Sequence, residues 1–420
     1  MLQPASALGT PCGRALAADA LDDAVRREVQ ACSARGVPVS GYLYRPEVAA
    51  LRARKLRAAL PPWATLLFAV KANSYEPVLA ALSTDGGVDG FEVASLGEAQ
   101  LASAILPPGR PIAAAGPAKH PGLLAGLLAA GVTVVHAESV TELRRLDVLG
   151  RELGRRIPVA LRVNPARVAV TGTLAMGGRG TAFGIPEHDV PAALDLARAL
   201  PGIDVVGFHV HAASGSLDAR AHAAYVGWVL EWSSATARAT GVELRWVDAG
   251  GGLGVSYDGT VALDLAVLAE ELAALTPPTG VEVAIEPGRW LAADCGWYAA
   301  EVVDLKDSHG TTFVIVRGGI GGYALPATED FPFPVAVVAV DEWREPFPRP
   351  ERTDVTVTIG GELCTPEDVL VRDVRLERVR VGDVLVFPRA GAYGYEFALR
   401  DFLGHPAPTR RVLAGAPSLV

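Results

Sequence analysis

The chain has 420 residues, of which 50% are hydrophobic and 20% are charged, and its formal net charge is −9. This composition is typical of a soluble globular protein with a large core, and the negative charge argues against non-specific binding to nucleic acid. The longest apolar stretch, residues 123–135, is shorter than the roughly 20 residues that a membrane-spanning helix needs.

Eight apolar, β-rich segments recur between residues 65 and 288. Ala/Leu-rich segments with helical spacing, such as 76–86 and 97–106, separate them. Near-continuous apolar strands that alternate with amphipathic helices indicate a parallel sheet covered on both faces, and eight such units predict a (β/α)₈ barrel. The segments are TLLFAV (65–70), GFEVAS (90–95), PIAAAG (111–116), VTVVHA (132–137), VALRVN (159–164), VVGFHV (205–210), LRWVDAG (244–250) and VEVAIEPG (281–288).

After about residue 290 the sequence becomes β-rich and is punctuated by proline and glycine. This change predicts a second domain built from an antiparallel sheet. We therefore expect a barrel over residues 46–290 and a C-terminal β domain over residues 291–420. Residues 1–45 are expected to be an N-terminal segment that contributes to the β domain, since SGYLYRPEV (40–48) begins like a strand.

Two connections are distinctive. The proline-rich stretch 331–350 is expected to be a loop or an edge insertion. The glycine-rich connection 165–191 is expected to form a mobile or ligand-shaped loop near the top of the barrel.

The four cysteines form no CxxC pair, so neither a zinc site nor a disulfide framework is predicted. No basic segment followed by a sustained apolar run opens the chain, so no signal peptide is predicted. A reducing cytoplasm fits this cysteine usage best. The cysteines are Cys12, Cys32, Cys295 and Cys364.

Polar residues follow the ends of the apolar segments. One such residue by itself is usually only solvated. Active sites of (β/α)₈ barrels, however, lie at the carboxyl ends of the strands, so a whole set of polar residues there predicts a site. The set comprises Lys71, Arg162, Asn164, His209, His211, Asp248, Gly250, Gly251, Gly252, Glu286 and Arg289.

The turn Gly250–Gly252 offers three consecutive glycines directly after a strand. Backbone N–H groups in such a turn converge on an anion, although glycine-rich turns are also common without one. The turn is neither a Walker A loop nor a GxGxxG fingerprint. With Arg289 at the end of the next strand, a phosphate site becomes the favoured interpretation, because arginine offers a planar fork of donors.

The remaining polar residues indicate a ligand that contains a flat, charged ring. His211 lies on a loop of small residues with Ser214 and is either a structural histidine or a platform for a ring whose phosphate Ser214 contacts. A carboxylate such as Glu286 would keep a pyridine nitrogen protonated. Together with the amine of Lys71, these groups describe a site for pyridoxal 5'-phosphate (PLP), in which the lysine forms a Schiff base.

The chain resembles the fold-type III PLP-dependent decarboxylases, the family of ornithine, diaminopimelate and arginine decarboxylases. The resemblance implies an alanine racemase-like fold, which is a PLP-binding barrel with a C-terminal antiparallel β domain. It also implies a head-to-tail homodimer with shared active sites. The motifs that carry it are FAVKAN, FEVASLGE, LRVNP, HVHAASGS, DAGGGLG, EPGRW, GGELCTPEDVL and GAYGYEF.

The resemblance also implies roles for matching residues. Lys71 would be the Schiff-base lysine, His211 would stack on the cofactor ring, and Glu286 would pair with its pyridine nitrogen. Cys364 would be a proton donor that comes from the partner subunit. Further cofactor contacts would come from Arg162, Ser214, Gly250, Gly251, Gly252, Gly288, Arg289 and Tyr393, and further substrate contacts from Thr365, Asp368 and Arg317.

The segments GELCTPEDVL and FLGHPAP look most like those of siderophore-biosynthesis decarboxylases, which act on conjugates such as citryl-diaminopropionate. The chain departs from the wider family at Glu92, where an aspartate is usual, and before Phe183, where a lysine is often found. Thr365 follows Cys364 where relatives usually carry an acid, and Arg317 replaces an aspartate. A neutral hydroxyl cannot compensate a buried ammonium, so the far end of the substrate is predicted to be neutral or anionic.

Other readings remain. The chain could decarboxylate diaminopimelate, ornithine or lysine, it could be an amino acid racemase, or it could bind PLP without catalysis. Racemases of this fold typically pair the pyridine nitrogen with arginine, so Glu286 favours a decarboxylase. A β domain that carries Cys364 favours catalysis. A phosphate-binding barrel without PLP would leave Lys71 and Glu286 unexplained.

Overall fold

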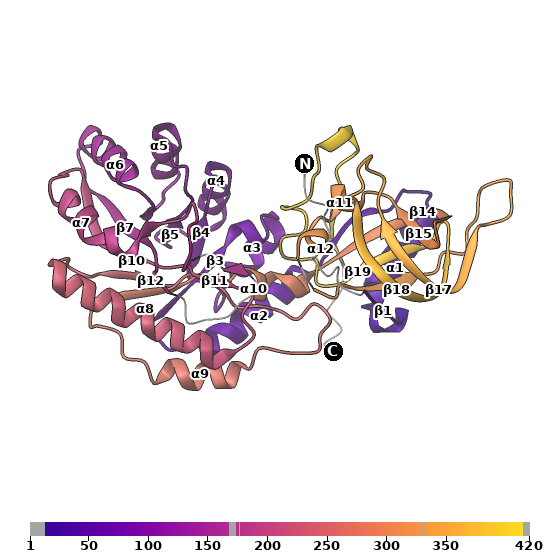
Figure 1. The fold of residues 1–420 in the computed structure, drawn as a ribbon, viewed down its shortest axis with the longest axis horizontal. Coiled ribbons are helices and arrows are strands. Elements are labelled where there is room, and N and C mark those ends of the chain that lie inside the picture. The colour runs from indigo at the N-terminus through magenta and orange to yellow at the C-terminus, as the bar shows by residue number, and fades with distance from the viewer. Residues whose placement is uncertain (1–12, 168–173, 176, 330, 415–420) are drawn as a thin grey trace. The chain divides into compact units, whose positions relative to one another are not determined.

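The computed structural model describes residues 13–167, 174–175, 177–329 and 331–414. They form two compact units (Figure 1). The barrel unit comprises Ala49–Val255 and Val261–Leu291. The β unit comprises the described residues up to Val48, the short segment Ser256–Thr260 and those from Ala292 onward.

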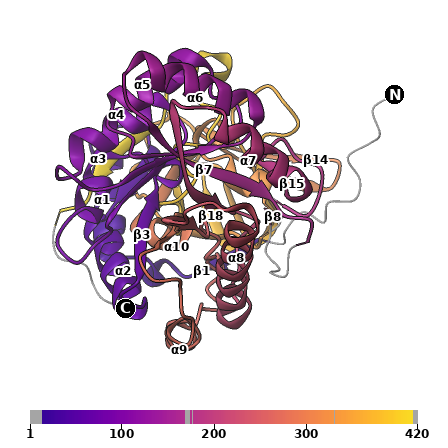
Figure 2. The same ribbon diagram turned by 90° about the vertical axis from the view of Figure 1, so that its left-hand side faces the viewer.

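The barrel unit contains a closed ring of eight parallel strands, seen end-on in Figure 2. Each strand pairs with the next, and the last pairs with the first at Val283↔Ala64. Each predicted apolar segment supplies one strand, so the (β/α)₈ barrel is confirmed. The strands are β3 (Ala64–Ala69), β4 (Gly90–Val93), β5 (Ile112–Ala114), β6 (Val134–Ala137), β7 (Ile157–Asn164), β10 (Ile203–His209), β12 (Trp246–Asp248) and β13 (Glu282–Ile285).

Helices surround the strands (Figure 2). The hydroxyls of Ser95 and Ser139 cap α4 and α6 by accepting hydrogen bonds from the N–H groups of Glu98 and Glu142, as the S-x-x-E pattern favours. Helix α8 ends at Gly241, whose φ of 71° suits glycine. The helices of this unit are α2 (Pro46–Ala59), α3 (Glu76–Leu82), α4 (Leu96–Ile105), α5 (Pro121–Ala129), α6 (Val140–Glu152), α7 (Val190–Arg198), α8 (Ala219–Thr240), α9 (Leu265–Ala273) and α10 (Arg289–Ala292).

A cluster of small and apolar side chains fills the inside of the barrel. It consists of one residue from each of seven strands: Leu67, Ala113, Val134, Ala160, Val206, Trp246 and Ala284. Side chains of a strand return to the same face every second residue. Four of these residues are therefore followed, two positions later and on the same face, by a polar side chain. Those polar residues are His136, Arg162, Asp248 and Glu286.

The β unit is a nine-stranded, mostly antiparallel sheet, which confirms the second fold predicted from the sequence. Strand β2, from the N-terminal segment, lies between β14 and β20 in this sheet. Helix α1 (Asp23–Ala34) also belongs to the unit. The strands are β1 (Arg14–Leu16), β2 (Ser40–Tyr44), β14 (Gly296–Ser308), β15 (Thr311–Val316), β16 (Pro334–Val338), β17 (Glu351–Gly360), β18 (Val369–Arg380), β19 (Val384–Phe387) and β20 (Thr409–Val412).

The proline-rich stretch 331–350, expected to be a loop or an edge insertion, contains the strand β16, so a loop is the wrong expectation for these five residues. Strand β16 pairs with β1 and β19. Pro334 is tolerated because it opens the strand, where a missing N–H group does least harm. The glycine-rich connection contains the short strands β8 (Leu174–Ala175) and β9 (Ile185–Pro186), while part of it, 168–173 and 176, lies outside the described residues.

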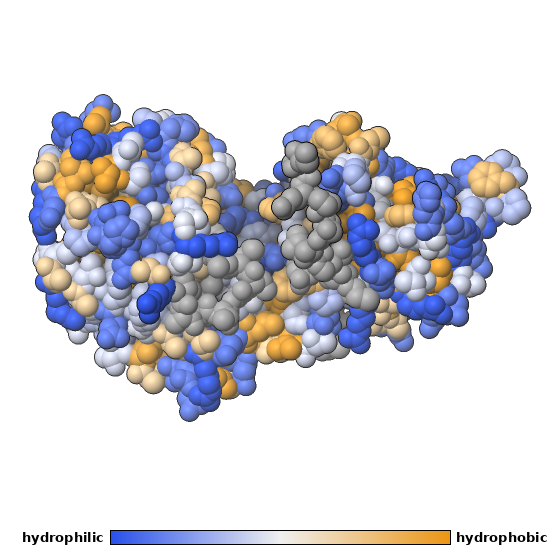
Figure 3. Space-filling view, viewed as in Figure 1, coloured by the Kyte–Doolittle hydropathy of each residue, from blue (hydrophilic) through white to orange (hydrophobic). Residues whose placement is uncertain are grey.

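Within the described part of the chain, no helix has both the length and the apolar character needed to cross a membrane. On the face shown in Figure 3, hydrophilic side chains are widespread and apolar ones form separate groups. One such group lies over the turn η5 (Phe402–Gly404) of the β unit, where Phe402 and Leu403 are 45% and 52% exposed.

Candidate active site

Lys71 lies in the single turn η2 (Val70–Ala72) that follows β3. Its Nζ is 2.5 Å from Oε2 of Glu92 on β4, and the lysine side chain is 41% exposed whereas that of Glu92 is buried. Burial raises the pKa of Glu92 to about 7, although the charge of Lys71 opposes that rise. The structure thus gives Lys71 an accessible amine beside a carboxyl group that titrates near neutral pH.

The chain has only four lysines, Lys55, Lys71, Lys119 and Lys306. Lys119 also lies after a barrel strand, but it is buried and its Nζ is 3.1 Å from Glu142. Lys55 lies on the exposed side of α2, and Lys306 lies on β14 in the β unit. Lys71 is therefore the one lysine of the chain with an accessible amine at the carboxyl ends of the barrel strands.

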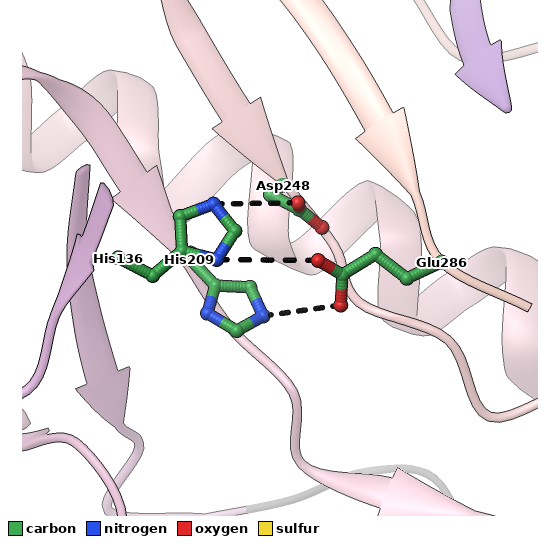
Figure 4. Close-up of side chains that lie close together, drawn as sticks. All are labelled: His136, His209, Asp248 and Glu286. Carbon is green, nitrogen blue, oxygen red and sulfur yellow. Dashed lines mark ion pairs between the residues drawn. The ribbon is translucent and has the colours of Figure 1, made fainter. Parts of the chain in front are cut away.

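Glu286 follows β13 and meets two histidines that the barrel strands β6 and β10 turn inward (Figure 4). Its Oε1 is 3.9 Å from Nδ1 of His136, and its Oε2 is 3.5 Å from Nε2 of His209. The two imidazole rings stack with centroids 4.1 Å apart. On its other side, Nε2 of His136 is 3.6 Å from Oδ2 of Asp248. All four side chains are buried.

Burial dominates the electrostatics of this group. It holds the pKa values of His136 and His209 well below their usual range, and it raises that of Asp248 well above its own. Burial alone would also raise the pKa of Glu286, but the neighbouring His136, Lys71 and Asp248 lower it. Because His136 is itself held neutral, we attribute the lowering to Lys71 and Asp248. Glu286 is then the anion of the group.

The turn after β12 requires glycine. Gly250 and Gly252 have φ values of 69° and 110°, in the region that favours glycine. A Cβ on Gly250 would lie 2.6 Å from Nδ1 of His211, and one on Gly251 would lie 2.3 Å from the carbonyl oxygen of Glu286. The turn therefore brings bare backbone between the histidine and the glutamate, which suits the predicted phosphate nest.

His211 is held at both ring nitrogens. Its Nδ1 accepts a hydrogen bond of 3.1 Å from the N–H of Gly251, and its Nε2 is 3.2 Å from the hydroxyl of Ser214. Burial lowers the pKa of His211 to about 3. An accepting Nδ1 places the proton of the neutral ring on Nε2, so both the tautomer and the plane of the ring are fixed. Such a ring can stack on a flat ligand.

Arg162 pairs with Glu138, a carboxylate that was not predicted from the sequence. Its Nη1 donates to Oε1 of Glu138 at 2.7 Å, and its guanidinium lies 4.7 Å from the ring centroid of Phe183. Glu138 is buried and also accepts from the N–H groups of Gly116 and Gly184. These contacts anchor the glycine-rich connection beside β7. Arg289, a predicted phosphate ligand, opens α10 directly after Gly288.

The other predicted residues belong to the β unit. Cys364 is exposed on the loop between β17 and β18. Asp368 is buried, and its two oxygens accept from the N–H groups of Ile320 and Leu363 at 2.7 Å each. These bonds make Asp368 a support of the Cys364 loop, and its predicted contact with substrate stays a prediction.

The two remaining substrate residues predicted in this unit already have partners within it. Nε of Arg317 lies 3.4 Å from Oε2 of Glu301. The hydroxyl of Thr365 donates to Glu367. Tyr393, a predicted phosphate ligand, has a φ of 54° in the segment GAYGYEF. The structure fixes these positions within the β unit, and their roles stay predictions.

The barrel residues fit PLP by their chemistry. Glu286 is buried, and its carboxylate oxygens can accept a hydrogen bond from a ring N–H. The glycine turn offers backbone to a phosphate, His211 offers a fixed ring, and Lys71 offers an amine. We find no conflict between these residues and the cofactor.

Residues 49–293 match the family model of the pyridoxal-dependent decarboxylases, pyridoxal binding domain. The chain is 33% identical to the decarboxylase of 2-[(L-alanin-3-ylcarbamoyl)methyl]-2-hydroxybutanedioate from Staphylococcus aureus, over 91% of this chain and 96% of that protein. It is 30% identical to the L-glutamyl-[BtrI acyl-carrier protein] decarboxylase of Niallia circulans, over 87% of each.

Among solved structures, the diaminopimelate decarboxylase of Helicobacter pylori complexed with L-lysine superimposes with a TM-score of 0.78 at 23% identity, over 91% of this chain and 93% of that one. At this identity the likeness shows the fold alone. The family match and the relatives above show more. The chain belongs to the pyridoxal-dependent decarboxylases and is a PLP-dependent carboxy-lyase.

Proposed function

We propose that this enzyme decarboxylates an amino acid conjugate whose far end is amidated, acylated or carboxylated, as in a siderophore precursor such as citryl-diaminopropionate. The observation that carries the proposal is Thr365, a neutral residue directly after Cys364. The two flanking glutamates of this loop already have partners, because Glu367 accepts from the Thr365 hydroxyl and Glu362 accepts from the N–H of Gly318. By their names, the Staphylococcus aureus relative acts on an L-alanin-3-ylcarbamoyl conjugate of a hydroxybutanedioate, and the Niallia circulans relative acts on an L-glutamyl group joined to an acyl-carrier protein.

The residues of the barrel would divide the work of the site. When bound, PLP supplies an electron sink for the pair of electrons left on the α-carbon as carbon dioxide departs. Lys71 would hold the cofactor covalently, and the charged Glu286 would keep the pyridine nitrogen protonated. His211 would support the ring from one face. Gly250, Gly251, Gly252 and Arg289, with Ser214 and Tyr393, would hold the phosphate.

Cys364 would return a proton to the α-carbon of the product. It is exposed, as a residue that meets substrate must be. Lys71 and Cys364 lie in different compact units of the chain. We propose that the site is completed by a second copy, so that the enzyme is a homodimer in which Cys364 of the partner subunit reaches the barrel.

Mixing inactive Lys71→Ala and Cys364→Ala homodimers is expected to restore activity. A mixed dimer would contain one site with both residues intact, so random exchange of subunits should recover up to about a quarter of the wild-type rate. The measurement is carbon dioxide release after subunit exchange has been verified. A Lys71→Ala and Glu286→Gln mixture is the control, because both changes lie in the barrel and leave no intact site. Equal rates in the two mixtures would contradict an active site that is shared between the subunits.

A substrate panel tests the predicted far end. We expect kcat/KM for citryl-diaminopropionate to exceed the values for lysine, ornithine and meso-diaminopimelate by at least roughly 10- to 100-fold, since a buried, unsatisfied donor costs about 1–3 kcal/mol and a charged one costs more. Comparing Nδ-acetylornithine with ornithine removes the charge from the same diamino acid while adding only a two-carbon acyl group. Thr365→Asp should raise the rate with ornithine. If a free diamino acid has the highest kcat/KM by a wide margin, the predicted neutral or anionic far end of the substrate is wrong. The assignment of PLP chemistry would still stand.

We also propose a cytoplasmic location. Within the described residues, Cys32, Cys295 and Cys364 form no disulfide, which supports a reducing compartment. Cys12 lies outside those residues.

A further inference from the structure

Four buried side chains form a connected group at the carboxyl ends of the barrel strands: His136, His209, Asp248 and Glu286, here called the buried quartet (Figure 4). Only Glu286 of the quartet has a proposed role. Several of its polar atoms have no hydrogen-bond partner at the distances seen, among them both ring nitrogens of His136, Oδ2 of Asp248 and Oε1 of Glu286. Buried polar atoms normally have partners, so this concentration requires an explanation.

A metal ion is one explanation, because one ligand atom from each residue lies within 4.8 Å of the others. The arrangement of the rings argues against it. The imidazoles of His136 and His209 stack with 24° between their planes and centroids 4.1 Å apart. Each imidazole binds a metal through a lone pair in the plane of the ring, and lone pairs of nearly parallel, stacked rings do not converge on one point.

The protonation states of the quartet indicate instead that its members are linked by a proton on one of the acids. Burial keeps His136 and His209 neutral and raises the pKa of Asp248, whereas that of Glu286 is lowered. The quartet then holds one acid, one carboxylate and two neutral rings. The charged or titratable groups that face His136 are His209, Asp248 and Glu286 from the quartet, and Lys119 and Arg162 beyond it.

The backbone decides where the acid proton resides. Oδ1 of Asp248 accepts a hydrogen bond of 2.8 Å from the N–H of Gly250. The proton therefore belongs on Oδ2, the oxygen that lies 3.6 Å from Nε2 of His136. If Nε2 accepts that proton, the neutral ring carries its own N–H on Nδ1, the nitrogen that lies 3.9 Å from Oε1 of Glu286. A closer approach of up to about 1 Å would make both contacts hydrogen bonds.

We propose that His136 is a positioning residue that links a protonated Asp248 to the carboxylate of Glu286 and so keeps Glu286 charged and oriented for the cofactor. The proposal rests on the role of Glu286 proposed above. The chain of donors runs in one direction, from the Asp248 hydroxyl to Nε2 and from Nδ1–H to Oε1. The same arrangement ties Glu286 to the phosphate turn, because the N–H of Glu286 donates to the carbonyl of Gly250 at 2.8 Å.

Three variants of the full-length enzyme test the link. His136→Phe keeps a ring on His209 and removes both nitrogens. Asp248→Asn replaces the proposed hydroxyl by an N–H donor of similar shape and keeps an oxygen for Gly250. His222→Phe is the matched control, because His222 is a buried histidine of α8 outside the quartet. The readouts are the dissociation constant of PLP from the apoenzyme, the pH dependence of the visible spectrum of bound PLP, and ¹⁵N spectra of labelled histidine.

His136→Phe is expected to weaken PLP binding roughly 10- to 100-fold, as for a lost hydrogen bond to a charged group, and to shift the spectral midpoint. Asp248→Asn should keep the wild-type midpoint, since the donor survives. The ¹⁵N spectrum of the apoenzyme should show His136 protonated on Nδ1. A wild-type spectrum in His136→Phe, equal damage in both quartet variants, or an Nε2–H tautomer would overturn the proposal. If Glu286→Gln also leaves the spectrum unchanged, the proposed role of Glu286 fails as well.

Discussion

Lys71→Ala is expected to abolish covalent attachment of PLP and to lower kcat by several powers of ten. Each power of ten corresponds to about 1.4 kcal/mol of activation free energy. The reason for both effects is that the chain offers one accessible lysine amine at the carboxyl ends of the barrel strands. Wild-type enzyme treated with borohydride should carry a reduced cofactor on the peptide that contains residue 71. Mass spectrometry of the variant should find no modified lysine.

Lys55→Ala is the matched control, because Lys55 is an exposed lysine on α2 of the same barrel unit. It should retain both the modified peptide and full turnover. A variant at position 71 that still carries reduced cofactor on another lysine would refute the assignment. The buried Lys119 is the position to inspect first.

Glu286→Gln is expected to retain PLP and to lower kcat by about two to three powers of ten, or about 3–4 kcal/mol. Glutamine keeps the shape of the side chain and loses the charge that favours a protonated pyridine nitrogen. KM should change much less than kcat, because the loss concerns the transition state. Steady-state carbon dioxide release with the preferred substrate gives both constants.

Glu282→Gln provides the comparison for this variant. Glu282 opens the same strand, β13, but is exposed and accepts a hydrogen bond from the Thr65 hydroxyl. Removing the charge of Glu282 should leave kcat unchanged. An unaltered kcat in Glu286→Gln would show that the pyridine nitrogen does not depend on this carboxylate.

The sequence predicted the barrel because each strand is a nearly continuous apolar run, a pattern that reports burial on both faces directly. It also indicated Lys71, His211 and Glu286, because they follow strands where no apolar residue is required. It missed His136 and Glu138. His136 lies inside the run VTVVHA and looks like an ordinary strand residue. Counting every second position from Val134 would have turned it toward the barrel interior.

Other features depend on partners that no local pattern reveals. Arg317 meets Glu301 only because β14 and β15 pair as a hairpin whose register shifts between Val302 and Asp304. Asp368 supports the Cys364 loop through the backbone of Ile320, which is distant in sequence. The segment Ser256–Thr260 groups with the β unit although its neighbours on both sides belong to the barrel. Its local composition carries no signal of that change.

The pairing of β2 has a consequence for synthesis on the ribosome. Its residue Gly41 pairs with Ala299 on one side and with Thr409 on the other. The nascent chain therefore carries an unpaired strand edge while the whole barrel, which closes with β13, emerges and can fold. Long-range strand pairing is slow and exposes edges that attract other chains. Truncation before Thr409 would leave that edge open permanently. We expect the full-length nascent chain to depend on chaperones until β20 has been made.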